Sequence, residues 1–162
     1  MKLYVMRHGP AEDDAPGGDS TRALTPSGRD RVRDVAKALV DAGEVPKLVV
    51  SSPLVRALQT AEIVHAYAKI EAPVQVHPAI APHGAALELV RDHAARGKKR
   101  LMLVGHEPDC SILVATLVGR PLSVPFTKAM IAALRVPNEG GDATVRFVLD
   151  PKTLDITRMQ PD

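Results

Sequence analysis

The chain has 162 residues, a formal net charge of +2 and an aromatic content of 2%. Its length predicts one domain over residues 1–162 that buries about 70% of the surface its unfolded chain exposes. Interspersed charges and scarce aromatic side chains argue against nucleic-acid binding. The single cysteine, Cys110, excludes an intrachain disulfide, and Arg7 interrupts the opening apolar run before it is long enough for a signal peptide. We therefore expect a cytoplasmic protein, monomeric and associated with neither nucleic acid nor membranes.

The first apolar run, residues 3–6, predicts a buried strand that leads into a tight turn at Gly9. The polar residues 10–19 then predict an irregular loop across the end of this strand, which we expect to contact substrate. Thr25 is the predicted cap of a helix that runs to Gly43. Four apolar residues at helical spacing turn this helix toward the sheet: Val32, Val35, Ala36 and Leu39.

The rest of the chain alternates between apolar strand-like runs and amphipathic segments. In chain order the next expected elements are a strand at residues 48–50, a helix at 53–68, a short strand at 74–76, a helix at 85–96 and a strand at 101–104. A helix from Pro108 to Gly119 follows, with Ile112, Leu113 and Leu117 as its apolar residues. The last elements are a hairpin of residues 129–136 and 143–149 and a strand within 153–159. The alternation predicts the α/β class. We expect three α/β/α layers around a mostly parallel sheet, with the antiparallel hairpin at one edge.

Two strands of this predicted sheet each lead directly to a histidine, His8 and His106. Arg7 precedes the first histidine, and Arg56 lies in the first turn of the helix after a third strand. Because the carboxyl ends of parallel strands meet at one edge of a sheet, we expect the four side chains to converge there. Two histidines and two arginines with few carboxylates nearby suit a dianion such as a phosphoryl group. The start of the helix after His106 adds its positive dipole end.

Four segments of the chain carry a family resemblance: Arg7-His8-Gly9, Arg22-Ala23-Leu24-Thr25-Pro26-Ser27-Gly28, Ser51-Ser52-Pro53-Leu54-Val55-Arg56-Ala57-Leu58-Gln59-Thr60-Ala61 and Val104-Gly105-His106-Glu107-Pro108. In these segments the sequence resembles the histidine phosphatase superfamily, which has the phosphoglycerate mutase-like fold. The resemblance extends to about Gly119 and is greatest to the small branch of SixA-type phosphohistidine phosphatases. It implies a phosphatase without metal or cofactor and assigns the catalytic roles to Arg7, His8, Arg56 and His106.

These four residues, which we call the cradle, also suit the chemistry of phosphoryl transfer to an imidazole. A neutral ring nitrogen must attack phosphorus in line while fixed cations hold the equatorial oxygens. His8 is the predicted nucleophile, and Arg7 and Arg56 offer planar donor forks that take the place of a metal ion. His106 completes the cradle, either as a protonated ring or as a neutral hydrogen-bond donor.

Further residues lie near these motifs. Gly9 and Arg22 are predicted substrate contacts, although an arginine just before a helix cap is equally typical of a surface ion pair. Ser52 and Gln59 fit loop and helix packing better than ligand binding. Cys110, on the helix after His106, fits a small packed side chain.

A general acid is missing from its expected place. The larger branches of the superfamily carry a carboxylic acid shortly after the third strand, but residues 77–84 contain none. The side chains that could take its place are Glu12, Asp13, Asp19, His83 and Glu107. An alkoxide leaving group requires such an acid, whereas the imidazole of phosphohistidine can leave neutral after its far nitrogen takes a proton from solvent.

The sequence therefore predicts a phosphatase that hydrolyses phosphohistidine on a protein, through a covalent phosphohistidine intermediate at His8. Only residues 10–19 and 78–84 could cover the site, so a phosphotransfer domain or phosphocarrier could reach it, a substrate assignment made by analogy with the family. Inorganic phosphate or another oxyanion should occupy the same cradle. The alternatives are a small-molecule phosphomonoesterase of the superfamily and a catalytically weak phosphate-binding module.

Overall fold

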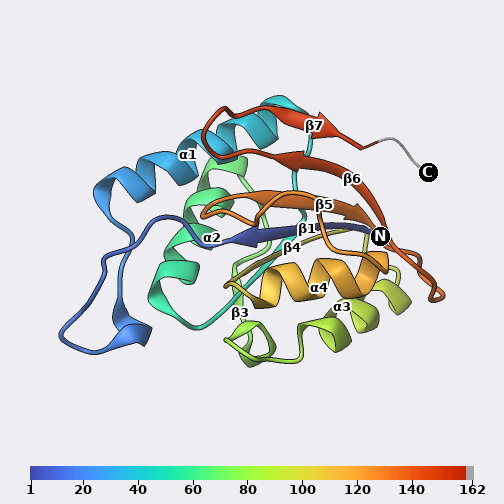
Figure 1. Ribbon diagram of the computed structural model, residues 1–162, viewed down its shortest axis with the longest axis horizontal. Coiled ribbons are helices and arrows are strands. Elements are labelled where there is room, and N and C mark those ends of the chain that lie inside the picture. Colours follow the sequence, from blue (N-terminus) through green and yellow to red (C-terminus); the bar gives the residue numbers. More distant parts are fainter. Residues whose placement is uncertain (160–162) are drawn as a thin grey trace.

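The computed structural model describes residues 1–159, and within them the strands form one seven-stranded sheet of order β3-β2-β4-β1-β5-β6-β7 (Figure 1). The strands are β1 Lys2–Arg7, β2 Leu48–Ser51, β3 Gln75–Val76, β4 Arg100–Gly105, β5 Ile131–Arg135, β6 Thr144–Leu149 and β7 Ile156–Arg158. Strands β1 to β4 pair in parallel, whereas β5, β6 and β7 are antiparallel to their neighbours. The prediction of a parallel sheet extended by an antiparallel hairpin is confirmed, and β7 adds the outer edge.

Helices cover both faces of the sheet. The helices are α1 Pro26–Asp41, α2 Val55–Ala68, α3 Ala86–Ala95 and α4 Asp109–Val118, and two 3₁₀ turns span Asp19–Thr21 and Pro78–Ile80. Helices α1 and α2 pack on one face, and α3 and α4 on the other, which gives the three expected layers (Figure 1). In the described part of the chain, no helix is long and apolar enough to cross a membrane.

Alternation along the central strands builds two separate cores. Tyr4 and Met6 of β1 belong to the core under α1 and α2, while Leu3 and Val5 belong to the core under α3 and α4. All four side chains are essentially inaccessible to solvent. Burying a side chain of this size stabilises a fold by about 1.5–3 kcal/mol, so both faces hold β1 in place.

Local sequence signals set the helix ends. The Thr25 hydroxyl accepts the Gly28 N–H at 2.9 Å, and α1 begins at Pro26, as predicted. Helices α2 and α4 begin at Val55 and Asp109, slightly later than expected, because Leu54 and Pro108 occupy their N-cap positions.

The outer face of α4 corrects one detail of the sequence pattern. Leu113 and Leu117 are buried, but Ile112 is 57% exposed. Leu113 and Leu117 lie on the side of α4 that faces the sheet, and at about 100° per residue Ile112 falls outside this buried stripe. The Ile112 side chain therefore projects from the protein.

Candidate active site

Parallel pairing of β1 with β4 brings the two histidines together. Arg7 lies opposite Gly105 in the register, and the His8 N–H donates to the Gly105 carbonyl at 3.0 Å. The His8 and His106 rings follow directly and have centroids 5.2 Å apart. The two histidines therefore lie together at the carboxyl ends of these strands, as predicted.

The His8 ring is held as a neutral tautomer whose Nε2 carries no hydrogen. Its Nδ1 lies 2.7 Å from the Gly9 carbonyl oxygen, an acceptor, so Nδ1 carries the ring hydrogen. Nε2 is then unprotonated, and Arg56 Nε donates to it at 3.3 Å. The pKa of His8 is lowered to about 3, mainly by burial. The hydrogen bond to the Gly9 carbonyl acts in the opposite direction, while His106, Arg56 and Arg7 also lower the pKa. At neutral pH the ring therefore presents a nucleophilic nitrogen.

Gly9 is required by close packing behind His8. A Cβ on this residue would lie 2.5 Å from Val32 Cγ2 of α1. The Gly9 N–H donates to Thr60 Oγ1 at 3.0 Å, and its carbonyl accepts from His8. These contacts fix the backbone that orients the nucleophile, and a direct contact of Gly9 with substrate stays a prediction.

Arg56 projects from the first turn of α2 into the cradle, where its side chain is only 6% exposed. Besides its bond to His8, it donates to the Asp19 carbonyl at 2.8 Å and to the Asp19 carboxylate at 3.2 Å. The expectation of few nearby carboxylates was thus wrong for Asp19. The reason is that the 3₁₀ turn of residues 19–21 folds the loop after β1 back onto α2.

Arg7 approaches from the end of β1. Its NH1 donates to the Phe126 carbonyl at 2.9 Å, which orients the guanidinium. Its Nε is buried and has no hydrogen-bond partner within residues 1–159. Arg7 therefore keeps an unused donor inside the protein.

His106 is neutral and contacts a serine. Its Nε2 lies 2.8 Å from the Ser52 hydroxyl oxygen. Burial lowers the pKa of His106 most, and the positive charge of Arg56 lowers it further, to about 4, although Asp109 and Asp19 act in the opposite direction. Of the two expected forms, the neutral ring is therefore the one favoured at pH 7.

Two buried nitrogen atoms in the described chain lack a partner, Arg7 Nε and His106 Nδ1. A buried donor without an acceptor destabilises a protein by about 1–3 kcal/mol. Both atoms belong to the cradle, whose side chains supply donors and positive charge. The arrangement suits an oxyanion, whose oxygens accept from several donors at once.

The structure places Arg22 in an ion-pair chain. Arg22 donates to the Asp19 carboxylate at 2.9 Å and to the Glu12 carbonyl at 2.9 Å. Asp19 thus bridges Arg22 and Arg56, so the ion-pair interpretation of Arg22 holds, and its contact with substrate stays a prediction.

Ser52 and Gln59 have different roles. Gln59 accepts the Leu24 N–H at 2.7 Å, as expected for packing. Ser52, expected to be a packing residue, instead contacts His106 of the cradle. Its place directly after the apolar run of β2 is the sequence signal for it, but the sequence does not show that β2 lies beside β4.

The candidate general acids differ in their surroundings. The hydrogen bond from Arg22 has the largest effect on the pKa of Asp19 and lowers it. Burial acts in the opposite direction, but the charge and hydrogen bond of Arg56 lower the pKa further, so this carboxylate is ionised and cannot give a proton at pH 7. Glu107 accepts from the Ser111 hydroxyl at 2.7 Å, and the His83 N–H donates to the Asp109 carboxylate. Glu12 and Asp13 are exposed on the loop after β1.

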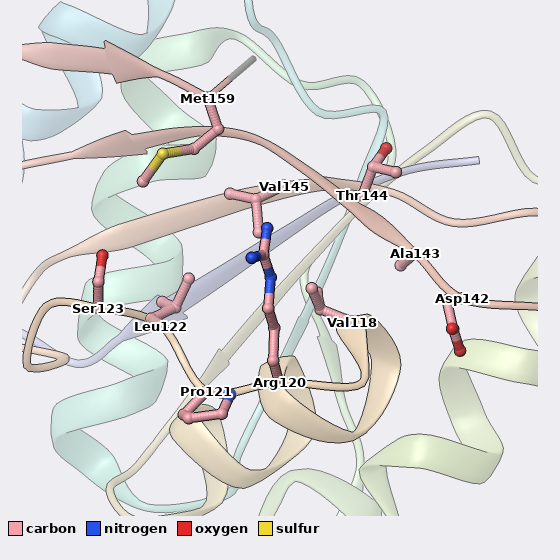
Figure 2. A pocket seen from close by; sticks show the side chains of 10 residues that line it. All are labelled: Val118, Arg120, Pro121, Leu122, Ser123, Asp142, Ala143, Thr144, Val145 and Met159. Carbon is pink, nitrogen blue, oxygen red and sulfur yellow. The ribbon is translucent and has the colours of Figure 1, made fainter. Parts of the chain in front are cut away.

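A large cavity lies far from this chemistry. It measures about 530 Å³, and the side chains that line it include Val118, Arg120, Val145 and Met159 (Figure 2). Val118 is the last residue of α4, whereas His106 precedes the first. None of the four cradle residues lines it. Within residues 1–159, no group of three or more His, Cys, Asp or Glu side chains is arranged to hold a metal ion.

Comparison with known proteins identifies the family. Residues 3–81 match the family model of the histidine phosphatase superfamily, branch 1. The phosphohistidine phosphatase SixA of Escherichia coli (strain K12) is 30% identical over 98% of this chain and 99% of its own length. The chain belongs to the SixA-type branch of the histidine phosphatase superfamily. As a member of this superfamily it is a phosphatase, a hydrolase.

Two further proteins are similar to this chain, and the solved structure among them supports the assignment. A solved structure of the protein histidine phosphatase SixA, complexed with tungstate, superposes with a TM-score of 0.88 and 29% identity, covering 96% of this chain and 100% of that chain. An uncharacterized protein of Picosynechococcus sp. (strain ATCC 27264 / PCC 7002 / PR-6) is 41% identical over 113 residues, or 67% of this chain and 68% of its own length. The predicted family and fold are confirmed.

Proposed function

We propose that this phosphatase hydrolyses phosphohistidine on a protein and that the phosphoryl group passes through His8. The observation that carries the proposal is the His8 ring, whose Nδ1 hydrogen is engaged by the Gly9 carbonyl while Nε2 keeps its lone pair beside Arg56. A nucleophile fixed in this tautomer does not need to lose a proton before it attacks.

In the first step, His8 Nε2 attacks phosphorus and the bond from phosphorus to the substrate nitrogen breaks. The bonding electron pair stays on the substrate imidazole, which leaves neutral because its other ring nitrogen takes a proton from solvent. In the second step, water attacks the phosphorus on His8, the bond to Nε2 breaks, and its electron pair restores the Nε2 lone pair. The proton lost by the water goes to phosphate or solvent.

The cradle supports both steps by balancing charge. Arg7 and Arg56 supply guanidinium donors to the phosphoryl oxygens, which also give acceptors to the buried Arg7 Nε and His106 Nδ1, two atoms with no partner within residues 1–159. Arg56 would shift its Nε from His8 to the phosphoryl group, which frees Nε2 for the attack. Tungstate in the related SixA structure is an oxyanion of the kind that such donors bind.

The preference for phosphohistidine over a phosphate ester follows from the state of the candidate general acid nearest to the cradle. A general acid contributes about 10²–10⁴-fold when the leaving atom must be protonated. Asp19, the candidate that contacts Arg56, is held ionised by Arg22 and Arg56. A leaving imidazole avoids this requirement, in agreement with the phosphohistidine activity in the name of the Escherichia coli relative.

The test is a comparison of kcat/KM for a phosphohistidine-bearing phosphotransfer domain, phosphoserine peptide and p-nitrophenyl phosphate. We expect the phosphohistidine protein to be preferred. A preference for an ester, with one carboxylate essential for its turnover, would support the phosphomonoesterase alternative. Binding of phosphate without turnover of any substrate would support the binding-module alternative.

A further inference from the structure

Ser52 occupies a rigid position between two strands and a helix. It directly follows β2 and is completely buried. Its N–H donates to the Val104 carbonyl of β4 at 3.0 Å, which continues the pairing between β2 and β4. The backbone that places Ser52 is therefore tied to the strand that places His106.

The hydroxyl of Ser52 has a restricted choice of partners. Its oxygen accepts the Leu54 N–H at 3.2 Å and lies 2.8 Å from His106 Nε2. The Leu54 amide can only donate, so it offers no acceptor to the serine hydrogen. Within residues 1–159, His106 Nε2 is the neighbour of the Ser52 hydroxyl that can accept this hydrogen.

The direction of this bond determines what His106 offers a ligand. A neutral imidazole carries one hydrogen, and when Ser52 donates to Nε2 that hydrogen resides on Nδ1. Nδ1 is the nitrogen that is buried without a partner. An Nδ1–H can donate to a phosphoryl oxygen, whereas an Nδ1 lone pair would repel it.

We propose that Ser52 is a positioning residue that donates to His106 Nε2 and thereby holds the ring as the Nδ1–H tautomer, a hydrogen-bond donor to the phosphoryl group. Ser52 does not itself touch the phosphoryl group. The inference rests on the proposed role of the cradle, and it adds a residue that fixes the protonation site of one member.

Ser51 offers a matched control for the test. Ser51 is equally buried and lies next to Ser52, but its hydroxyl donates to the Ser52 carbonyl at 2.8 Å and not to His106. Ser51→Ala and Ser52→Ala therefore remove the same atom from neighbouring buried positions. Only Ser52→Ala removes the hydrogen-bond partner of the His106 ring.

The direct readout is the tautomer of His106, measured in the full chain by long-range ¹H–¹⁵N NMR with labelled histidine at pH 7.5. We expect Nδ1 to be protonated and Nε2 unprotonated in the wild type and in Ser51→Ala. In Ser52→Ala the Nε2–H form should become populated. Affinity for tungstate should fall by about 10- to 100-fold in Ser52→Ala, the range known for partners that orient metal-bound histidines, and stay at the wild-type value in Ser51→Ala.

Two results would overturn the proposal. One is a wild-type spectrum with His106 protonated at Nε2, a measurement that remains decisive even if Ser52→Ala fails to fold. The other is a folded Ser52→Ala protein that keeps the Nδ1–H tautomer and wild-type tungstate affinity. Phosphorylation of His8 is measured separately, so its absence would refute the proposed function without changing the tautomer result.

Discussion

The two buried histidines should make the protein lose stability when the pH falls from 7 to 5. The pKa of His8 is lowered from 6.5 to about 3 by burial in the folded state. An unfolded chain therefore takes up a proton at His8 near pH 6.5, while the folded protein does not. Stabilisation by the neutral ring is complete above pH 6.5 and is lost as the pH falls toward 3.

The size of this effect follows from proton linkage. Between pH 7 and pH 5, protonation of an unfolded histidine with a pKa of 6.5 lowers the free energy of unfolding by about 2 kcal/mol, because the folded ring stays neutral. His106, with its pKa lowered to about 4, should contribute a similar amount. The two histidines together therefore account for about 4 kcal/mol over this pH range.

The assay is urea unfolding at pH 7 and pH 5 for the wild type, His8→Gln and Ser51→Ala. The loss of unfolding free energy between the two pH values should be about 2 kcal/mol smaller in His8→Gln than in the wild type. Ser51→Ala, which removes a buried hydroxyl but no titrating group, should lose as much as the wild type. Equal losses in His8→Gln and the wild type would show that His8 titrates alike in both states and would refute the reasoning.

Three other variants test separate parts of the site. Arg56→Ala should lower kcat/KM for phosphohistidine by about 10³–10⁵-fold, the range known for charge-stabilising arginines in phosphoryl transfer. Asp19→Asn should lower it far less, since an ionised carboxylate is not a proton donor; a loss as large as that of Arg56→Ala would give Asp19 a catalytic role. Gly9→Ala should lower the free energy of unfolding by about 1–3 kcal/mol, because its Cβ would press against Val32. Val32→Ala in the same chain should restore part of this loss, and a double variant whose loss equals the sum of the two single losses would contradict that contact.

Much of the fold follows from local patterns that need no partner to be recognised. The apolar run of β1, the Thr25 cap and the helical spacing from Val32 to Leu39 are each set by neighbouring residues. Their predicted places therefore agree with the structure. Because the carboxyl ends of parallel strands meet at one edge of the sheet, the same patterns also predict that His8 and His106 lie together.

The contacts that the sequence did not predict depend on how distant segments lie side by side. Ser52 meets His106 because β2 is the neighbour of β4, and strand order is absent from any local pattern. Asp19 reaches Arg56 because a loop without regular pattern folds back through one short turn. In both cases a polar residue of ordinary appearance becomes part of the site through tertiary packing.

The most direct test of the central claim is a search for phosphate on His8 during turnover. The protein is mixed with a phosphohistidine-bearing phosphotransfer domain, quenched under alkaline conditions that preserve phosphohistidine, and examined by peptide mass spectrometry. We expect phosphate on His8 within the first turnover and no turnover in His8→Ala. Wild-type turnover by His8→Ala, or phosphate accumulating on another residue of the enzyme instead, would contradict the assignment of His8 as nucleophile.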